Sequence, residues 1–434
     1  MNGHAYLRYA RYKESGEEWL EKIPGKWDTR RLKRCVTLAN RKCDDSALPY
    51  VGLENVESFT GRYLPATGET QPDVADSFAE TDVLFGKLRP YLAKVLALDF
   101  AGRCTGEFLA LRPRDFLDRR YLFHCCLSHG FVNIVNSSTF GSKMPRADWQ
   151  FIGRVCMPLP SIAEQRAIAA FLDRETARID ALIEKQERLL EKLEEKRKAM
   201  IAQAVTRGLD SNVPLKESGV EWLGKIPAGW DIRRGKAIFS EIDVRSRTGE
   251  EILLSLRMTQ GLVPHSDVSE KPMTQQDLIG YKLTFPGDIV VNRMRASSGL
   301  VAVTPQVGLV SPDYAVFRRH VDLETDFFAL LFRTPLMQAV FRSESTGLGN
   351  GTMGFLRLYS ESFLSLPYPF PEPSEQRAIV SFLREELDRM NDVIVKIQCL
   401  IAKLREKRTA LISAAVTGKI RVSEDRDCAG RCDG

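Results

Sequence analysis

The stretch EQRAIAAFLDRETARIDALIEKQERLLEKLEEKRKAMIAQAVT, Glu164–Thr206, constrains how the rest of this chain can be organised. It contains neither proline nor glycine, and it is rich in Ala, Leu, Glu, Lys and Arg, which are strong helix formers. A continuous helix of this length would span about 65 Å at ~1.5 Å per residue. A second copy occupies Glu375–Thr417 and is identical at 22 of 43 positions. The sequence therefore predicts two long helices of matched length.

An apolar row recurs every seven residues in both stretches, as in a coiled-coil seam. The row consists of Leu172, Ile179, Leu193 and Met200, with Gln186 in the middle, and of Leu383, Met390, Ile397, Leu404 and Leu411. The expected companion positions are Leu182, Leu189, Val393 and Leu400. Glycines that can stop a helix follow at Gly208 and Gly418. The matched register favours packing of the two helices against each other, and the alternative is two amphipathic helices packed separately.

The sequence that precedes each divergent region is repeated as well. KESGEEWLEKIPGKWDTRRLKR, Lys13–Arg34, matches Lys216–Ala237 at 15 of 22 positions, and we call this segment the preamble. Between the preambles and the helices the two middle regions, 35–157 and 238–366, diverge strongly. Both contain short β-prone runs and a short helical run, so each is expected to be an α+β domain. The repeated preambles and helices flank middle regions of different sequence. This pattern suggests a common scaffold that carries two domains with different recognition properties.

The order of the repeats suggests a circular permutation. The first long helix runs directly into the second preamble, whereas no preamble follows the second helix. If the chain is treated as a circle, each helix is followed by a preamble and a middle domain. We therefore expect Thr417–Arg421 to lie beside Lys13–Leu20 in a pseudo-twofold particle. Three pairs should pack the preambles against the helix ends: Trp19/Trp222, Ile23/Ile226 and Trp27/Trp230. Contact of Trp27 and Trp230 with a partner or DNA is the alternative.

One short correspondence survives inside the middle domains and points to nucleic acid. DVLFGKLRP, Asp82–Pro90, matches DIVVNRMRA, Asp288–Ala296, and strand alternation would place both cations of each on one face. Such cations suit phosphate oxygens or base edges. Polar, glycine-rich loops follow at Asn136–Trp149 and Ser343–Leu358. The candidate DNA-binding residues are Lys87, Arg89, Lys143, Arg146, Arg293, Arg295, Asn350, Thr352 and Arg357. Solvated strand ends and flexible connectors are the alternatives.

Chemistry-bearing motifs are missing from the sequence, so no catalytic residue and no metal ligand is assigned. There is no complete GxxxxGK[ST] phosphate loop, no nuclease triad and no histidine spacing typical of a metal site. The nine cysteines, without a signal peptide or a long apolar run, favour reduced thiols and a cytoplasmic protein. The pair Cys428 and Cys432 is only a weak metal motif. A net charge of +5 is compatible with an anionic partner.

Four doubled features together resemble the specificity subunits of Type I restriction–modification systems, over Lys13–Ile420. They are the ESG-EWL-KIP--W preamble, the DVLFGKLRP-type strand, the P-P…EQRAI…FL helix start and the EKR…AVT-G helix end. The resemblance implies a non-catalytic α+β protein whose two α/β target-recognition domains are separated by two long antiparallel coiled-coil helices. Each domain would read one half of an asymmetric bipartite sequence in double-stranded DNA, and the helices would act as a spacer.

The resemblance also implies a division of the chain and a set of partners. The expected parts are target-recognition domain 1 (1–158), a central helix (159–209), target-recognition domain 2 (210–370), a C-terminal helix (371–420) and a flexible tail (421–434). Two modification (methyltransferase) subunits and the restriction (translocase–endonuclease) subunits would assemble on it, and S-adenosylmethionine, ATP and Mg²⁺ would belong to those partners. The alternatives are a coiled-coil scaffold protein that does not bind DNA, and a specificity module of a related methyltransferase system.

Overall fold

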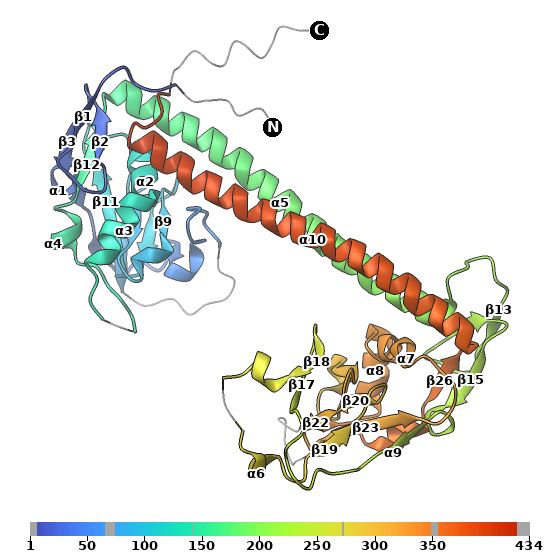
Figure 1. Ribbon diagram of the computed structural model, residues 1–434. Coiled ribbons are helices and arrows are strands. Elements are labelled where there is room, and N and C mark those ends of the chain that lie inside the picture. Colours follow the sequence, from blue (N-terminus) through green and yellow to red (C-terminus); the bar gives the residue numbers. More distant parts are fainter. Residues whose placement is uncertain (1–6, 66–73, 142, 271–272, 349–354, 423–434) are drawn as a thin grey trace, which may run out of the picture. The chain divides into compact units, whose positions relative to one another are not determined.

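The computed structural model describes residues 7–65, 74–141, 143–270, 273–348 and 355–422. The chain divides into two compact units. Unit 1 comprises Met1–Glu187 and Gln398–Gly434, and unit 2 comprises Arg188–Ile397. Two long helices, α5 (Ile162–Arg207) and α10 (Pro373–Val416), run from one unit into the other, so the two long helices predicted from the repeat are confirmed (Figure 1). The structure has mixed α and β content throughout both units.

A four-stranded antiparallel sheet lies at the centre of unit 1. Its order is β4 (Val36–Leu38), β11 (Phe108–Pro113), β8 (Val83–Gly86) and β9 (Val95–Leu96). Val83 and Phe85 belong to the core that includes α2 (Arg119–Leu127) and α3 (His129–Ser137), whereas Leu84 belongs to the core on the opposite face. Successive residues of a strand point to opposite faces, which explains why the whole run is apolar.

A second layer covers the other face of this sheet in unit 1. It is a four-stranded sheet in the order β5 (Arg41–Cys43), β7 (Ala75–Phe78), β10 (Gly102–Cys104) and β6 (Tyr50–Val51). The short elements of unit 1 are the hairpin β1 (Tyr12–Glu14)–β2 (Lys22–Pro24), the ladder β3 (Asp28–Arg31)–β12 (Cys156–Leu159), α1 (Leu32–Cys35), α4 (Trp149–Ile152) and the 3-10 turns Leu53–Asn55 and Pro90–Leu92.

Unit 2 repeats the central sheet with the same strand order. The strands are β16 (Phe239–Glu241), β23 (Tyr314–Arg319), β20 (Ile289–Asn292) and β21 (Val301–Val303), and the helices that follow are α7 (Thr325–Phe332) and α8 (Pro335–Ser343). The second layer differs, since here it consists of two separate ladders, β17 (Leu254–Arg257)–β18 (Gly261–Pro264) and β19 (Lys282–Thr284)–β22 (Gly308–Val310). The strong sequence divergence of the middle domains therefore coincides with a change of the second layer.

The remaining elements of unit 2 include counterparts of the preamble hairpin and of the β3–β12 ladder. These remaining elements are β13 (Leu215–Glu217)–β14 (Lys225–Pro227), β15 (Asp231–Arg234)–β26 (Pro367–Phe370), α6 (Gln275–Leu278), β24 (Thr346–Leu348)–β25 (Phe355–Arg357), α9 (Ser360–Ser365) and the 3-10 turns Gly235–Ala237, His265–Asp267 and Ala296–Ser298. The preamble forms a hairpin and then a strand in both units. That strand pairs with the strand immediately before the long helix, so each middle domain is closed at its base.

An identical ion pair fixes the central sheet in each unit. In unit 1 the guanidinium of Arg112 donates to both carboxylate oxygens of buried Asp82, at 2.7 and 2.9 Å. In unit 2 Arg318 binds Asp288 in the same way, at 2.7 and 2.8 Å. The acidic residue that begins the repeated DVLFGKLRP-type run is therefore a structural residue.

The long helices pack antiparallel within each unit. In unit 1 Asp180 pairs with Arg408 at 2.9 Å and Glu187 with Arg405 at 2.8 Å, so residue numbers rise along α5 as they fall along α10. In unit 2 Ala204 of α5 shares a core with Leu383 of α10. Most of the predicted row is buried, namely Leu172, Ile179, Leu383, Met390, Ile397, Leu404 and Leu411, while Leu193 and Met200 are half-buried.

The predicted companion positions of the seam were wrong. Leu182 and Leu189 are 40% and 42% exposed, and Val393 and Leu400 are exposed to a similar extent. The seam instead uses the residue four positions after each member of the row: Thr176, Ile183 and Leu190 in α5, and Leu387, Ile394 and Ile401 in α10. A coiled-coil seam alternates steps of three and four residues, and the sequence allowed either order.

The predicted joint between the chain's distant segments is confirmed within unit 1. The main-chain N–H of Arg421 donates to the carbonyl of Leu7 at 2.7 Å, and the hydroxyl of Tyr12 donates to the carbonyl of Gly418 at 3.0 Å. Trp27 is buried beside Gly418, and in unit 2 Trp230 is buried beside Gly208. Both glycines have positive φ, +71° and +77°, as expected where a helix ends. The preamble thus packs on the end of a long helix in each unit.

Candidate nucleic-acid interface

In unit 1 the two segments that carry the predicted cations lie side by side. The N–H of Arg89 donates to the carbonyl of Pro145 at 2.7 Å, and the N–H of Ala147 donates to the carbonyl of Lys87 at 2.9 Å. A β-bridge joins Leu88 and Arg146 between these bonds. The chain that leaves β8 and the loop before α4 therefore form one surface, although nearly sixty residues separate them in sequence.

The local backbone differs from the predicted strand. β8 ends at Gly86, and Arg89 has φ +51°, a left-handed conformation that leads into the 3-10 turn Pro90–Leu92. The prediction that Lys87 and Arg89 share one face of a strand was therefore wrong, because the strand ends at Gly86 and the chain turns at Arg89. Their proximity to the loop comes instead from the main-chain pairing.

We define patch 1 as Arg89, Phe140, Lys143, Met144 and Arg146. All five side chains are exposed, and Phe140 and Met144 remain 65% and 55% accessible although both are apolar. Arg146 also pairs with Glu107 on the adjoining strand end, which orients its guanidinium. Cations can neutralise phosphates, whereas exposed aromatic and thioether side chains can pack on bases or thymine methyl groups. Patch 1 thus has the composition of a nucleic-acid contact surface.

Unit 2 carries an equivalent surface at the equivalent place. The N–H of Leu358 donates to the carbonyl of Arg293 at 2.9 Å, which corresponds to the bond between Ala147 and Lys87. We define patch 2 as Met294, Arg295, Leu356, Arg357 and Tyr359, of which all but half-buried Arg357 are exposed. The guanidinium of Arg357 lies 5.8 Å from the ring centre of Tyr359 and 3.9 Å from the carboxylate of Asp313.

The predicted cations are not equivalent in their surroundings. Arg293 is largely buried, and its guanidinium binds the carboxylate of Glu241 and, at 3.1 Å, the hydroxyl of Ser360. The structure gives it an internal role, because its charge is already paired. The expectation that Arg293 and Arg295 share one strand face was wrong, since β20 ends at Asn292. Asn350 and Thr352, like Cys428 and Cys432, lie outside the described residues.

Sequence reasoning missed the apolar members of both patches. Phe140 and Met144 stand within the loop that was singled out for its polar and glycine residues, NSSTFGSKMPRADW. An apolar residue in a polar loop can fill a core or remain exposed, and sequence alone does not distinguish the two. The structure shows that Phe140 and Met144 are exposed and do not fill a core.

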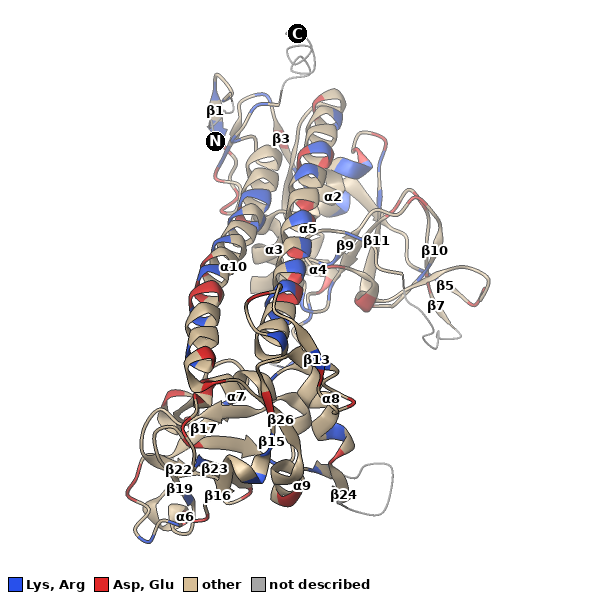
Figure 2. Cartoon of the chain, turned by 90° about the vertical axis from the view of Figure 1, so that its right-hand side faces the viewer, with Lys and Arg blue, Asp and Glu red and all other residues tan. Residues whose placement is uncertain are grey.

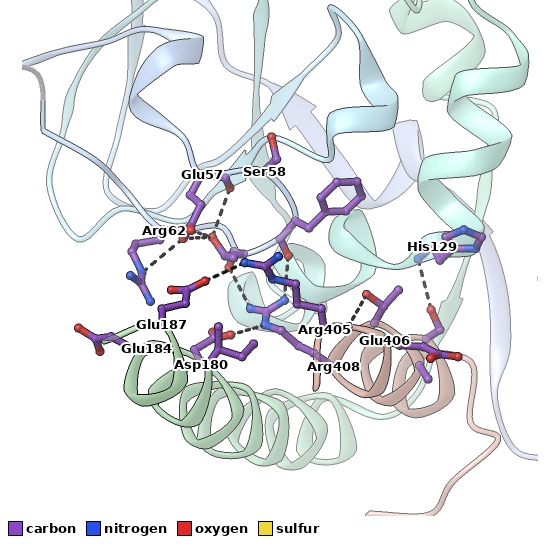
Figure 3. Close-up of a pocket in the computed structure, with 16 residues that line it drawn as sticks. Glu57, Ser58, Arg62, His129, Asp180, Glu184, Glu187, Arg405, Glu406 and Arg408 are labelled. Atoms are coloured by element: carbon purple, nitrogen blue, oxygen red, sulfur yellow. Dashed lines mark hydrogen bonds and ion pairs between the residues drawn. The ribbon is translucent and has the colours of Figure 1, made fainter. Parts of the chain in front are cut away.

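A pocket of about 870 Å³ in unit 1 lies between the loop at Glu57–Arg62 and the paired helices (Figure 3). Nearly buried Arg408 spans it, donating to Asp180 at 2.9 Å and to the carbonyls of Phe59 and Thr60 at 2.8 and 3.1 Å. Glu187 pairs with Arg405 across the same wall. These ion pairs and hydrogen bonds join the first middle domain to the helices, and we assign the polar groups a structural role.

Charges along the long helices are mixed in sign. Figure 2 shows Lys and Arg interspersed with Asp and Glu on both α5 and α10, so neither helix presents a uniformly basic face. Within the described part of the chain no group of His, Cys, Asp and Glu is arranged to hold a metal ion. Among the helices that the structure describes, none has the length and apolar character needed to cross a membrane.

Comparison with known proteins identifies a consistent set of relatives. No protein-family model matches the chain. The chain is 24% identical over 333 residues to the Type I restriction enzyme MjaVIII specificity subunit of Methanocaldococcus jannaschii, covering 72% of each protein. It is 23% identical over 173 residues to the EcoDI specificity subunit of Escherichia coli, and this match spans only 38% of that protein's length.

Solved structures show the same fold. The chain superimposes with a TM-score of 0.70 on a chain from a structure that addresses complex assembly and conformational transition of the type I R-M system, at 20% identity, covering 91% of this chain and 98% of the other. The HsdS subunit from Thermoanaerobacter tengcongensis gives a TM-score of 0.52 at 19% identity, covering 92% and 98%. In sequence, with its doubled preambles and helices, the chain is thus similar to specificity subunits of Type I restriction enzymes, and it has the fold of the HsdS subunit.

Proposed function

We propose that this chain is a non-catalytic reader of DNA, in which patch 1 and patch 2 each contact one half of a bipartite duplex sequence. The observation that carries the proposal is the recurrence of the same construction in both units. In each, the chain leaving the central strand pairs with the loop before the last short helix, and exposed cations stand beside exposed apolar side chains. The frame is constant and the side chains differ, which suits two readers of different sequences.

Division of labour within each patch follows from the chemistry of its side chains. Lys143 and Arg89, or Arg295 in unit 2, can neutralise phosphates, which contributes affinity that does not depend on sequence. Phe140 and Met144, or Tyr359 and Leu356, can make apolar contacts with thymine methyl groups at the base edges, where sequence is read. Because the two patches carry different side chains, the two half-sites are expected to differ.

The long helices would link the two readers and carry the partner subunits. Two weak sites joined by a stiff spacer gain effective concentration only when the half-sites match the distance between them. We assign the chemistry of methylation and cleavage to modification and restriction subunits bound to this chain. S-adenosylmethionine, ATP and Mg²⁺ would be bound by those subunits, in keeping with the missing phosphate-loop and cofactor motifs.

The proposal is tested by measuring duplex DNA binding at several salt concentrations, with the chain assembled with a modification subunit of its own system. Lys143→Ala should weaken binding to all sequences and lower the slope of log K against log salt by about one. Phe140→Ala should weaken binding to the preferred sequence by about 1–3 kcal/mol, similar to one mismatched base pair, while leaving the slope unchanged.

Lys26→Ala provides the matched control, because Lys26 is an exposed lysine of the preamble in the same unit. It should leave both the affinity and the slope at their native values. The proposal fails if the assembly does not prefer one duplex sequence, or if Lys143→Ala binds DNA no differently from Lys26→Ala. Where the assembly does prefer one duplex sequence, mapping the adenines that it methylates would identify both half-sites.

A further inference from the structure

The start of each long helix is attached to its middle domain by the same buried glutamine. The side-chain oxygen of Gln165 accepts the N–H of Asp118 at 2.8 Å, and that of Gln376 accepts the N–H of Glu324 at 2.8 Å. Asp118 and Glu324 are the N-cap residues of α2 and α7. These two bonds place α2 and α7 in the same register against α5 and α10, so residues of the two contacts can be compared one by one.

The apolar part of the contact is also the same in both units. Ile168 and Leu172 of α5 are completely buried, and so are Ile379 and Leu383, which occupy the same positions of α10. By burial and by hydrogen bonding alone, either middle domain would fit either helix start. Any preference for the correct helix must therefore come from other side chains.

The charged part of the contact is reversed between the units. Two positions after the N-cap of α2, the guanidinium of Arg120 binds the carboxylate of Asp173, eight residues beyond Gln165, at 2.5 and 3.1 Å. At the corresponding positions of unit 2, Asp326 belongs to α7 and Arg384 to α10, and they lie 3.4 Å apart. The middle domain supplies the cation in unit 1 and the anion in unit 2.

A buried histidine adds to the difference. His124, which is 1% exposed, bonds through Nε2 to the same carboxylate of Asp173 at 2.7 Å. The residue of α7 that corresponds to His124 is Leu330, which has no polar atom in its side chain. Helix α5 therefore offers an anion that is bound by two donor side chains, Arg120 and His124, whereas α10 offers a cation that binds one carboxylate.

We propose that these reversed charges are a recognition device, by which the start of each long helix accepts its own middle domain and rejects the other. An exchanged arrangement would bring Asp326 against Asp173 and Arg120 against Arg384, and it would leave buried His124 without its carboxylate acceptor. Like charges held in contact are destabilising, and the partly buried Asp173 would lose both of its donors. The two middle domains consequently hold fixed positions in the protein, and this inference does not depend on DNA binding.

A crossed experiment in the full chain tests the proposal. One set of variants keeps the native order, and the other exchanges residues 36–155 with residues 239–366. Each set is made with native helices and with the double substitution Asp173→Arg and Arg384→Asp. Hydrogen exchange of the peptides that contain α2 and α7 reports how often each contact opens. The helix substitutions should raise this exchange about fivefold or more in the native order and lower it in the exchanged order.

The proposal is overturned if the helix substitutions change the hydrogen exchange of α2 and α7 in the same direction in the native and the exchanged order. If the exchanged chain does not fold, variants in the native order decide the question. Asp173→Arg alone should increase opening of α2, and adding Arg120→Asp with His124→Leu, which copies the unit 2 arrangement, should reverse most of that increase. A triple variant that opens as readily as Asp173→Arg alone would contradict the device.

Discussion

Replacement of Gly418 by alanine probes the joint that closes unit 1. Gly418 follows α10 with φ +71°, and a Cβ atom there would lie 2.4 Å from two ring carbons of Pro24 and 3.1 Å from the ring of Trp27. Contacts below 3.0 Å force the backbone or the neighbour to move, and Pro24 lies within the short strand β2. The preamble would have to shift away from the end of the helix.

The expected cost combines two effects. A left-handed conformation costs a residue with a Cβ about 1–2 kcal/mol relative to glycine. Overpacking of a well-packed site costs about 1–3 kcal/mol more. The sum for Gly418→Ala is therefore about 2–5 kcal/mol. Two other glycines distinguish the conformational cost from the overpacking cost. Gly16 has φ +77° and a Cβ there would have no atom within 4 Å, whereas Gly208 has φ +77° and a Cβ there would have its nearest neighbours at 3.2 and 3.4 Å.

Hydrogen exchange of the preamble peptides, together with denaturant unfolding, gives the free energy of opening for each variant. Gly16→Ala should cost about 1–2 kcal/mol from backbone conformation alone. Gly208→Ala should cost slightly more in unit 2, and Gly418→Ala the most. If Gly418→Ala is no more destabilising than Gly16→Ala, then the preamble does not pack on the end of α10 as described.

Three further predictions concern the helix starts and patch 2. Gln165→Ala and Gln376→Ala should each destabilise their own unit by about 1–3 kcal/mol in denaturant unfolding, since each leaves the N–H of a helix N-cap residue unpaired. A variant as stable as the native chain would contradict the role given to these glutamine hydrogen bonds. Burial would raise the pKa of Asp173, but hydrogen bonds from His124 and Arg120 outweigh it and lower that pKa to about 2. The stabilisation from ionised Asp173 is thus complete above the unfolded pKa near 3.8 and is lost as pH falls through 2. The difference in unfolding free energy between the native chain and Asp173→Asn should therefore shrink between pH 4 and 2. A difference that stays constant over this range would argue against the pairing. Arg295→Ala should weaken duplex binding and lower its salt slope by about one, and an unchanged slope would remove Arg295 from the interface.

Features with a local period were predictable from the sequence. The long helices and the apolar row of each follow from a seven-residue repeat, which recurs about every two turns of helix. The middle regions do contain strands such as β23, whose sequence YAVFRR is rich in β-prone residues. The companion row could not be chosen, because a step of three or four residues is decided only by contact with the other helix. Leu182 is exposed and Ile183 takes its place for this reason.

Features that depend on pairing between distant segments were not predictable. The strands of the second layer are only two to four residues long, too short for a periodic signal. The bond between Lys87 and Ala147 joins segments nearly sixty residues apart, and the left-handed turn at Arg89 has no signature in a sequence that reads as a continuing strand. Sequence reasoning thus singled out the segments that form patch 1 but not the geometry that brings them together.

The division of the chain into units has a consequence for synthesis. Unit 2 is one continuous stretch, Arg188–Ile397, whereas the core of unit 1 includes Leu404, Leu411 and Val416 of α10. A ribosome that adds about 5–20 residues per second needs roughly 10–40 s to make unit 2 after the first part of unit 1 has emerged.

During that interval the core of unit 1, which includes Leu172 and Ile179 of α5, lacks the cover that α10 later provides. Exposed apolar surface of this kind favours aggregation and attracts chaperones. All residues of unit 2 are synthesised before the last turns of α10, which unit 1 needs to complete its core. A premature stop within those turns should therefore harm the first-made half of the protein most, and leave the later-made half folded.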